Sequence, residues 1–350
     1  MNKKLAVIVS PNWKDYAHKY LADLLDSLRV QRFDGESKLF LIDNESSPES
    51  LNYLRSLAPE AEIVINEKND GFAKGNNDAI KLALKQNFDY IFLINMDTVL
   101  DQNCFQKMVE AIQTEGVGAV QARLMLWPEK EKINSVGNAS HFLGFGYSLG
   151  YQQKYDSQEQ IDLEIAYPSG AGVIFSADVL KQVGLFDEEF WMYNEDQDLG
   201  WRIWLAGFKC ILARDAIVYH KYEFSRSIKK YYWMDRNRIL AILKNYHLLT
   251  LILIFPVFVL MEVGLLFFAI LKGWLPEKLR VYEYFFRAST WRYLTKARKD
   301  SQTIRRVADR QIVTMFKGRI LYQEIDNVLL RLANIFFEIY WKIVRLLIFW

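Results

Sequence analysis

With 350 residues, 51% of them apolar and 15% aromatic, the chain is long enough for one large core or two smaller ones, and a disordered protein is excluded. The formal net charge of +2 hides an asymmetry: residues 1–245 carry 34 acidic and 28 basic residues, whereas residues 246–350 carry 8 and 16. A basic tail with long apolar runs favours anionic lipid as a partner and argues against nucleic acid.

The first half of the chain alternates short apolar runs with helical patterns. Strands are predicted at residues 5–10, 38–43, 62–66 and 90–95, and helices at 16–29, 49–57 and 73–85. This alternation predicts βαβ units, and therefore an α/β fold with a mostly parallel sheet and helices on both faces. Residues 117–176 mix glycine, aromatic and charged residues, and we expect mixed strands and loops there.

The amino-terminal apolar run, residues 5–9, is too short for the core of a signal peptide and lacks a small-residue cleavage site. The two cysteines, Cys104 and Cys210, lack the spacing of a zinc site or a disulfide framework. Both features lead us to expect catalysis in a reducing cytoplasm.

Polar residues gather where the predicted strands end, and the carboxyl ends of parallel strands share one crevice. A carboxylate there can accept from a nucleobase N–H, and glycine backbone and amide side chains can approach a ribose or phosphate closely. Taken singly, each motif is equally compatible with turn and cap chemistry. The candidates for a nucleotide site are Asp43, Asn44, Asn69, Gly71, Gly75, Asn76, Asn95 and Asp97.

A second acidic cluster, Glu195, Asp196 and Asp198, follows Asp97 by about a hundred residues. Two such clusters suggest a divalent metal, a phosphorylated substrate and a general base. Repulsion and partial burial should raise the pKa of at least one carboxyl of residues 195–198. Alternatively, these carboxylates complement the dipole of a helix that starts here.

In their joint order these motifs resemble the bacterial family 2 glycosyltransferases of GT-A fold, especially the rhamnosyltransferase-like members. The resemblance covers about residues 4–246, and it includes residues 169–172, 183–190, 194–202 and 231–245. It implies inverting transfer of a sugar, with rhamnose as the first candidate, from a dTDP- or UDP-sugar. The implied acceptor is a polyprenyl-linked or growing cell-surface glycan.

The resemblance also implies roles for single residues. Asp43 would contact the nucleobase, and Asn95 with Asp97 would take the place of the family's D-x-D motif, which holds the ribose and a Mg²⁺ or Mn²⁺ ion. Because the first position is Asn here, Asp97 is left as the dependable ligand. Asp196 would be the base, with Glu195 and Asp198 in reserve. The acceptor or its pyrophosphate would meet Gly170, Ala171, Trp201 and Arg202.

Three assignments keep a structural alternative. His220 resembles an occasional metal ligand of the family, but a histidine at a strand end is as often a hydrogen-bonding residue of the framework. Gly170 and Ala171 fit equally a turn before a strand at residues 173–176. Arg236 and Arg238 suit bidentate contacts to pyrophosphate, or form a basic face toward phospholipid.

The carboxyl-terminal part, residues 246–350, is predicted to be a helical membrane-associating region beside a catalytic domain of residues 1–245. Residues 247–270 are long enough to span a bilayer, although Pro256 and Glu262 interrupt them. Both flanks are basic, which favours a re-entrant or in-plane hairpin on the cytoplasmic face over a single crossing. A buried core helix is a third possibility. Residues 327–350 predict an interfacial helix, or one packed on its neighbour.

Three rival functions differ in their requirements. A nucleotidyltransferase would normally carry a glycine-rich loop with Lys or Arg near the first strand, and residues 10–13 offer none. A non-catalytic or regulatory membrane-bound scaffold of GT-A fold would tolerate loss of acidic residues, yet Asp97 and Asp196 are present. A processive synthase would need more membrane spans than this tail offers.

Overall fold

The computed structural model describes residues 3–156, 163–222, 228–321 and 328–350. The chain forms two compact units, which are described separately. The first comprises residues 1–138, 148–203 and 208–223, and the second residues 139–147, 204–207 and 224–350. The helix that follows residue 227 thus belongs to the second unit, whereas the predicted boundary lay at residue 245.

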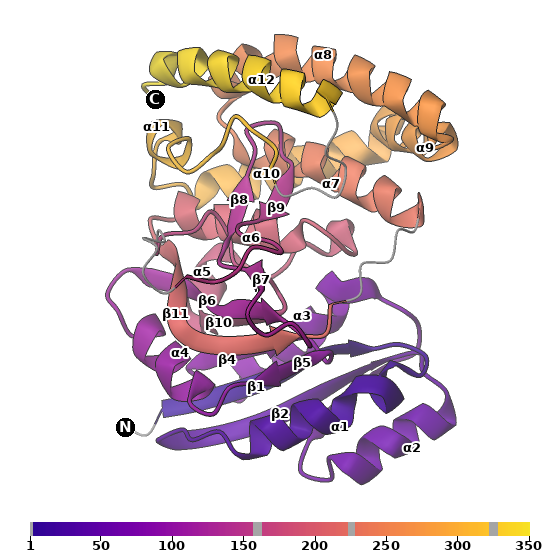
Figure 1. The fold of residues 1–350 in the computed structure, drawn as a ribbon, viewed down its shortest axis with the longest axis vertical. Coiled ribbons are helices and arrows are strands. Elements are labelled where there is room, and N and C mark those ends of the chain that lie inside the picture. Colours follow the sequence, from indigo (N-terminus) through magenta and orange to yellow (C-terminus); the bar gives the residue numbers. More distant parts are fainter. Residues whose placement is uncertain (1–2, 157–162, 223–227, 322–327) are drawn as a thin grey trace. The chain divides into compact units, whose positions relative to one another are not determined.

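A nine-stranded sheet organises the first unit (Figure 1). Its strand order is β3-β2-β1-β4-β10-β6-β11-β5, with β7 paired to β6. The predicted βαβ alternation is confirmed, since β1 pairs in parallel with β2 and β4, and β2 with β3. The elements are β1 (Lys3–Asn12), α1 (Tyr16–Arg29), β2 (Gly35–Asn44), α2 (Pro48–Leu57), β3 (Glu62–Asn66), α3 (Gly71–Lys85) and β4 (Tyr90–Ile94).

The later strands are partly antiparallel. β10 (Gly172–Ser176) runs antiparallel to both β4 and β6 (Val117–Leu126), and β6 is parallel to β11 (Lys209–His220). All ten residues of β6 are buried, so its sequence lacks the alternation that marks a half-exposed strand. The remaining elements are β5 (Thr98–Leu100), α4 (Cys104–Ile112), β7 (Ile133–Ser135), β8 (Asn138–Ser140), β9 (Gly146–Ser148), α5 (Ala177–Val183), η1 (Glu188–Phe190) and α6 (Glu195–Leu205).

Helices cover both faces of this sheet. On one face, the apolar sides of α1 and α4 pack on the sheet, and Leu21, Leu24 and Leu25 of α1 are buried as their spacing predicted. On the other face, α3 packs on β1 and β2 and buries Ala79 and Ile80. The carboxyl ends of β1, β2, β3 and β4 therefore meet at one edge between two helical layers.

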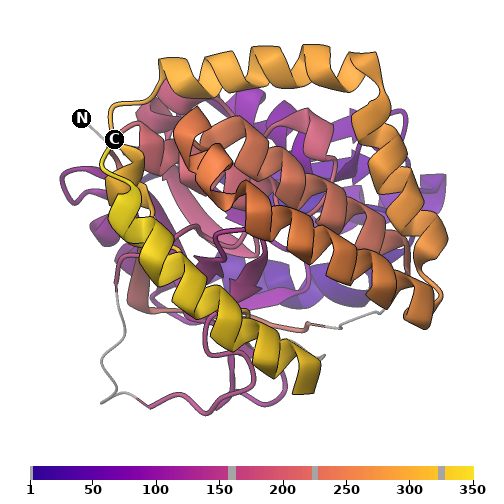
Figure 2. The same ribbon diagram turned by 90° about the horizontal axis from the view of Figure 1, so that it is seen from above.

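The second unit is largely helical (Figures 1 and 2). α7 packs on α9 and α10, and α8 packs on α9 and α12. Among the described residues, α8 alone is long and apolar enough to cross a membrane by length and composition, and it runs without a break through Pro256. The helices are α7 (Ile228–Asn245), α8 (Leu248–Lys272), α9 (Leu275–Phe286), α10 (Ala288–Thr303), α11 (Asp309–Ile312) and α12 (Val328–Leu347).

Candidate active site

The carboxylate of Asp97, just beyond β4, meets His220 at the end of β11. Its Oδ1 lies 3.2 Å from His220 Nε2, and its Oδ2 accepts a 2.7 Å hydrogen bond from the Tyr16 hydroxyl. Burial acts to raise the pKa of Asp97, but the His220 ring and the Tyr16 hydroxyl outweigh it, so the pKa is lowered. Asp97 is therefore an anion at neutral pH.

The second ring nitrogen of His220 determines what faces Asp97. Nδ1 lies 3.0 Å from Asn134 Oδ1, an arrangement in which Nδ1 carries the proton and donates it. Nε2 then turns its lone pair toward Asp97 Oδ1, and two acceptors 3.2 Å apart require a positive charge, either a second proton or a metal ion. Two cis ligands of an octahedral ion with bonds of about 2.1 Å lie about 3 Å apart. The pair therefore fits a divalent cation.

The protein alone offers few metal ligands. No three His, Cys, Asp or Glu side chains converge on a metal-sized position within the described part of the chain. Asp97 and His220 would supply two ligands, and phosphate oxygens and water would complete the shell, as Mg²⁺ and Mn²⁺ permit.

Three buried acceptor oxygens in the first unit have no hydrogen-bond donor among the described residues, and a fourth, on Asp97, faces His220 Nε2 alone among them. Such an atom costs about 1–3 kcal/mol, so it persists where a ligand, an ion or water satisfies it. Two of the atoms follow β4, one lies in the first turns of α3, and one begins α6. They are Asn76 Oδ1, Asn95 Oδ1, Asp97 Oδ1 and Glu195 Oε2.

Asp196 joins this edge through the segment that precedes β10. The Asn95 N–H donates to the Ala171 carbonyl over 3.3 Å, and the Gly170 N–H donates to the Asp196 carboxylate. Gly170 and Ala171 thus connect the end of β4 to the start of α6. The structure brings these four predicted site residues together.

The two acidic residues that begin α6 differ in environment. Asp196 keeps part of its surface exposed, and burial raises its pKa to about 6 although the N–H groups of Gln197 and Gly170 oppose the shift. Glu195 is buried, and its pKa is raised by burial and then by the charge of Asp196. Asp196 is the carboxylate that combines access with a pKa near neutrality, which suits a general base.

Asp198 and Arg202 are not placed to act on a ligand, contrary to the prediction. Asp198 is fully buried, and Arg202 Nε donates to its Oδ2 at 2.9 Å. The other guanidinium nitrogens donate to the carbonyls of Val183 and Leu185, both at 2.6 Å. This pair fastens α6 to the end of α5. Trp201, on the same helix, is also buried.

Asp43 lies in a buried network at the end of β2. Asn12 Nδ2, from the end of β1, donates to Asp43 Oδ1 at 3.0 Å and lies 3.1 Å from Ser50 Oγ, while Asn12 Oδ1 accepts from the Ala17 N–H. Asn12 therefore fixes the Asp43 carboxylate and the start of α1 together. Nothing in the sequence singles out Asn12, because its role depends on two strands lying side by side.

The segment around Asn69 and Gly71 is occupied by protein contacts. Asn69 Oδ1 accepts from the Gly71 N–H, and Asn44 Nδ2 donates to the Gly71 carbonyl, both at 3.1 Å. Gly71 has φ of +75°, and a Cβ there would lie 2.5 Å from the Trp191 carbonyl oxygen. Turn contacts thus account for the side chains of Asn44 and Asn69, and Trp191 crowds the α-carbon of Gly71.

Arg236 and Arg238 lie in the second unit and are both buried, which differs from the predicted pyrophosphate contact. Arg236 stacks on the rings of Trp233 and Tyr284, with 4.5 and 4.8 Å from its guanidinium to the ring centres. Arg238 Nε donates to Asp235 Oδ1 at 2.8 Å. Neither side chain is exposed to a phosphate.

Two further side chains of the first unit were missed at the sequence level. Tyr16, the first residue of α1, holds Asp97 as described above. Arg123 of β6 is buried, stacks 3.8 Å from the centre of the Tyr155 ring, and its Nε has no hydrogen-bond partner among the described residues. It pairs in register with Ile217, three residues before His220. The sequence around Arg123 does not show that this arginine is buried, because its position depends on how β6 pairs with β11.

The family model described as "Glycosyltransferase like family 2" matches residues 3–238. The chain belongs to this family. The predicted family membership is thereby confirmed.

Three known proteins resemble this family member distantly. The hexosyltransferase Agl10 of low-salt glycan biosynthesis in Haloferax volcanii is 22% identical over 174 residues, and the match spans 49% of this chain and 54% of that relative. The structure of S. aureus TarS 1–349 in complex with UDP has a TM-score of 0.50 and 16% identity, covering 98% of this chain and 90% of TarS. GalNAc-T7 with UDP, GalNAc and Mn²⁺ has a TM-score of 0.54 and 14% identity, covering 71% and 49%. These structures show the GT-A fold.

Proposed function

We propose that the protein is an inverting, metal-dependent glycosyltransferase. It would move a sugar from a dTDP- or UDP-sugar to a polyprenyl-linked or growing cell-surface glycan at the cytoplasmic face of the cell membrane. Rhamnose is the first candidate for the sugar. Two structural neighbours were solved with UDP, one of them also with Mn²⁺, which supports a nucleoside diphosphate and a divalent ion here.

The observation that carries the proposal is the set of unsatisfied acceptors at the carboxyl end of β4. Asn95 Oδ1 has no hydrogen-bond donor among the described residues, and Asp97 Oδ1 faces His220 Nε2 alone among them. A buried carboxylate beside other acceptors is complemented by a cation. Bound there, Mg²⁺ or Mn²⁺ would neutralise the charge that develops on the departing diphosphate.

The chain's own residues account for the remaining chemistry. Asp196 takes the proton from the acceptor hydroxyl, whose oxygen attacks the anomeric carbon on the face opposite the diphosphate. The bond between that carbon and the phosphate oxygen breaks, its electron pair leaves with the nucleoside diphosphate, and the configuration inverts. The Gly170 N–H orients Asp196, and Asn134 orients His220 toward Asp97.

The decisive variant is Asp196→Asn. We expect transfer to fall by about 10³-fold or more, because the amide cannot take a proton, while nucleotide-sugar binding persists. Asp178→Asn, an exposed carboxylate on α5, is the matched control and should leave both unchanged. Near-normal transfer by Asp196→Asn would exclude this residue as the base.

A screen of nucleotide-sugars defines the donor. dTDP-rhamnose is tested first, then UDP-sugars, with binding measured calorimetrically in Mn²⁺, in Mg²⁺ and in chelator. Release of nucleoside diphosphate supports sugar transfer, whereas release of pyrophosphate would point to nucleotidyl transfer. Binding without turnover on any lipid-linked acceptor would favour the non-catalytic scaffold.

A further inference from the structure

One face of α8 is exposed and apolar along its whole length. The exposed large side chains recur every three or four residues from the first turn to the last, and all are aliphatic or aromatic. They are Leu248, Leu249, Ile252, Phe255, Val259, Leu260, Val263, Phe267, Ile270 and Leu271. A soluble surface rarely keeps so long an apolar strip in contact with water.

α12 extends this strip. Its exposed apolar residues also lie on one face, opposite a buried face that contains Phe337 and Trp341. Tyr340 of α12 donates a 2.6 Å hydrogen bond to the Leu253 carbonyl of α8, and Figures 1 and 2 both show the two helices on the same side of the second unit. The α12 residues are Leu332, Ile335, Phe336, Ile339, Ile343, Leu346 and Leu347. Together with the α8 residues above they are called the apolar surface.

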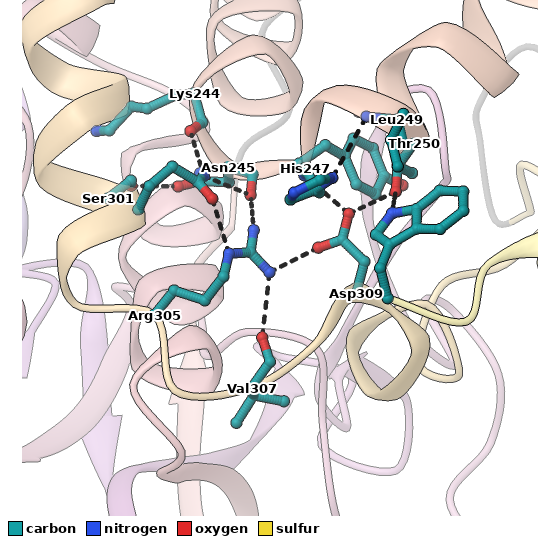
Figure 3. Close-up of polar contacts among 12 residues, drawn as sticks. Lys244, Asn245, His247, Leu249, Thr250, Ser301, Arg305, Val307 and Asp309 are labelled. Carbon is teal, nitrogen blue, oxygen red and sulfur yellow. Dashed lines mark hydrogen bonds and ion pairs between the residues drawn. The ribbon is translucent and has the colours of Figure 1, made fainter.

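The opposite face of α8 is held by polar contacts at its start. Asp309 Oδ2 accepts from the His247 N–H at 2.8 Å and from the Thr250 hydroxyl at 2.6 Å, and Arg305 pairs with Asp309 Oδ1 at 2.7 Å (Figure 3). Trp350 Nε1 lies 3.0 Å from the Thr250 hydroxyl oxygen. A buried carboxylate at this end also complements the helix dipole.

A cluster of buried ionic groups holds the middle of α8. Glu262 pairs with Arg238 of α7, and its Oε2 accepts from Lys278 Nζ of α9 at 2.7 Å. Lys278 Nζ and Arg238 Nε also donate to Asp235, at 2.7 and 2.8 Å. Glu262 therefore does not interrupt an apolar helix. It marks the inward face, where its charge is matched.

At its far end, α8 stops against Trp274. The Trp274 N–H donates to the Ala269 carbonyl at 2.8 Å, and the Phe268 and Trp274 rings contact with centres 5.6 Å apart. The helix is thus attached to the second unit at its start, middle and end. If α8 crossed the bilayer alone, Glu262 and Thr250 would enter hydrocarbon without their partners. Moving an unpaired charge or hydroxyl there costs free energy.

From these contacts we infer that α8 lies in the plane of one leaflet and does not cross the bilayer. The apolar surface enters the boundary between headgroups and acyl chains, while the inward face of α8 stays on the protein. Exposed Arg331, Lys342 and Arg345 border this surface on α12, and Lys272 ends α8. They would meet anionic headgroups, so the partner is an anionic lipid bilayer. The inference rests on the membrane association proposed above.

Vesicle sedimentation of the full chain tests the partner. We expect at least tenfold stronger partition onto vesicles with phosphatidylglycerol than onto phosphatidylcholine alone, and at least a tenfold loss for Val259→Asp/Ile339→Asp. Ile65→Asp, at a comparably exposed residue of β3, is the matched control and should bind like the parent. Unchanged binding of the double variant would overturn the inference. The inference would also be overturned if the parent did not bind vesicles but formed a dimer, and the double variant dissociated that dimer.

Depth measurement separates lying from crossing. Single cysteines at Ile252, Val263 and Ile270 carry an environment-sensitive fluorophore, since Cys104 and Cys210 are buried and should not react. We expect lipid-borne quenchers to place all three at one shallow depth, and a label at exposed Ile65 of β3 to stay unquenched. A steady progression from one interface through the bilayer centre would establish a crossing while leaving membrane association intact. Sugar transfer, assayed in detergent, is independent of either result.

Discussion

In the first unit, acceptor oxygens at the end of β4 and the start of α6 are buried without hydrogen-bond donors among the described residues. In the second unit, by contrast, the buried charges pair with one another, namely Asp235, Arg238, Glu262 and Lys278. The acceptor oxygens of the first unit would be satisfied by a bound cation or another ligand. The second unit matches the charges of its ionic cluster internally and leaves apolar residues exposed. The difference separates a ligand site from a docking surface. Acceptors without donors call for a cation or a polar ligand, and exposed apolar residues call for an apolar partner.

The largest effect should follow removal of the charge at Asp97. We expect Asp97→Asn to reduce transfer by about 10³-fold or more and to abolish the metal dependence of nucleotide-sugar binding, measured by calorimetry with and without Mn²⁺. His220→Gln should cost about 10–100-fold, and exposed His18 supplies the control His18→Gln. Metal-dependent binding that survives Asp97→Asn would mean that the unsatisfied acceptors of the first unit serve another ligand.

The ionic cluster of the second unit should respond through stability. Lys278→Met leaves Asp235 and Glu262 buried with less compensation, so we expect a loss of about 3–5 kcal/mol in denaturant unfolding. Lys296→Met, at an exposed lysine of α10, should change the unfolding free energy by less than about 0.5 kcal/mol. Equal effects of the two variants would show that the cluster is not what attaches α8 to the unit.

Two glycines with nearly the same φ allow a matched test in the first unit. Gly71 has φ of +75° and is crowded by Trp191, whereas Gly116 has φ of +78° and no described atom within 4 Å of the position that a Cβ would take. Gly116→Ala should cost about 1–2 kcal/mol through its backbone alone, and Gly71→Ala about 1–3 kcal/mol more. Similar losses of unfolding free energy would contradict the contact between Gly71 and Trp191.

The smallest effect concerns the pH dependence of folding. The pKa of Asp196 rises from 3.8 to about 6 on folding, so its protonated form is favoured in the folded protein. That contribution is fully present below about pH 4 and is lost as the pH rises through about 6. Asn mimics the protonated form, so Asp196→Asn should gain about 1–2 kcal/mol at pH 8 and almost nothing at pH 4. Thermal unfolding at the two pH values measures the difference, and a gain independent of pH would point to another cause.

The sequence by itself determined much of the first unit. Short apolar runs and helical patterns predicted β3 and α1 at their observed bounds, and α1 buries its apolar side against the core. The positions of Asn95 and Asp97 at a strand end followed from the same reasoning. The family resemblance added His220 and Asp196, which the fold brings to one edge of the sheet.

Tertiary structure decided which polar residues are available. Three arginines have side chains suited to phosphate but are engaged by the protein itself. Arg202 pairs with Asp198, Arg236 stacks on aromatic rings, and Arg238 pairs with Asp235. The sequence around each arginine does not reveal that it is buried. Asn12 and Tyr16 acquire their roles only when β1, β2 and β4 lie side by side. For α8, the sequence determined the length and the apolar character of the helix. Only the partners of Glu262 distinguish the face packed on the protein from the exposed apolar face. A buried charge is tolerated in such a helix where an opposite charge pairs with it.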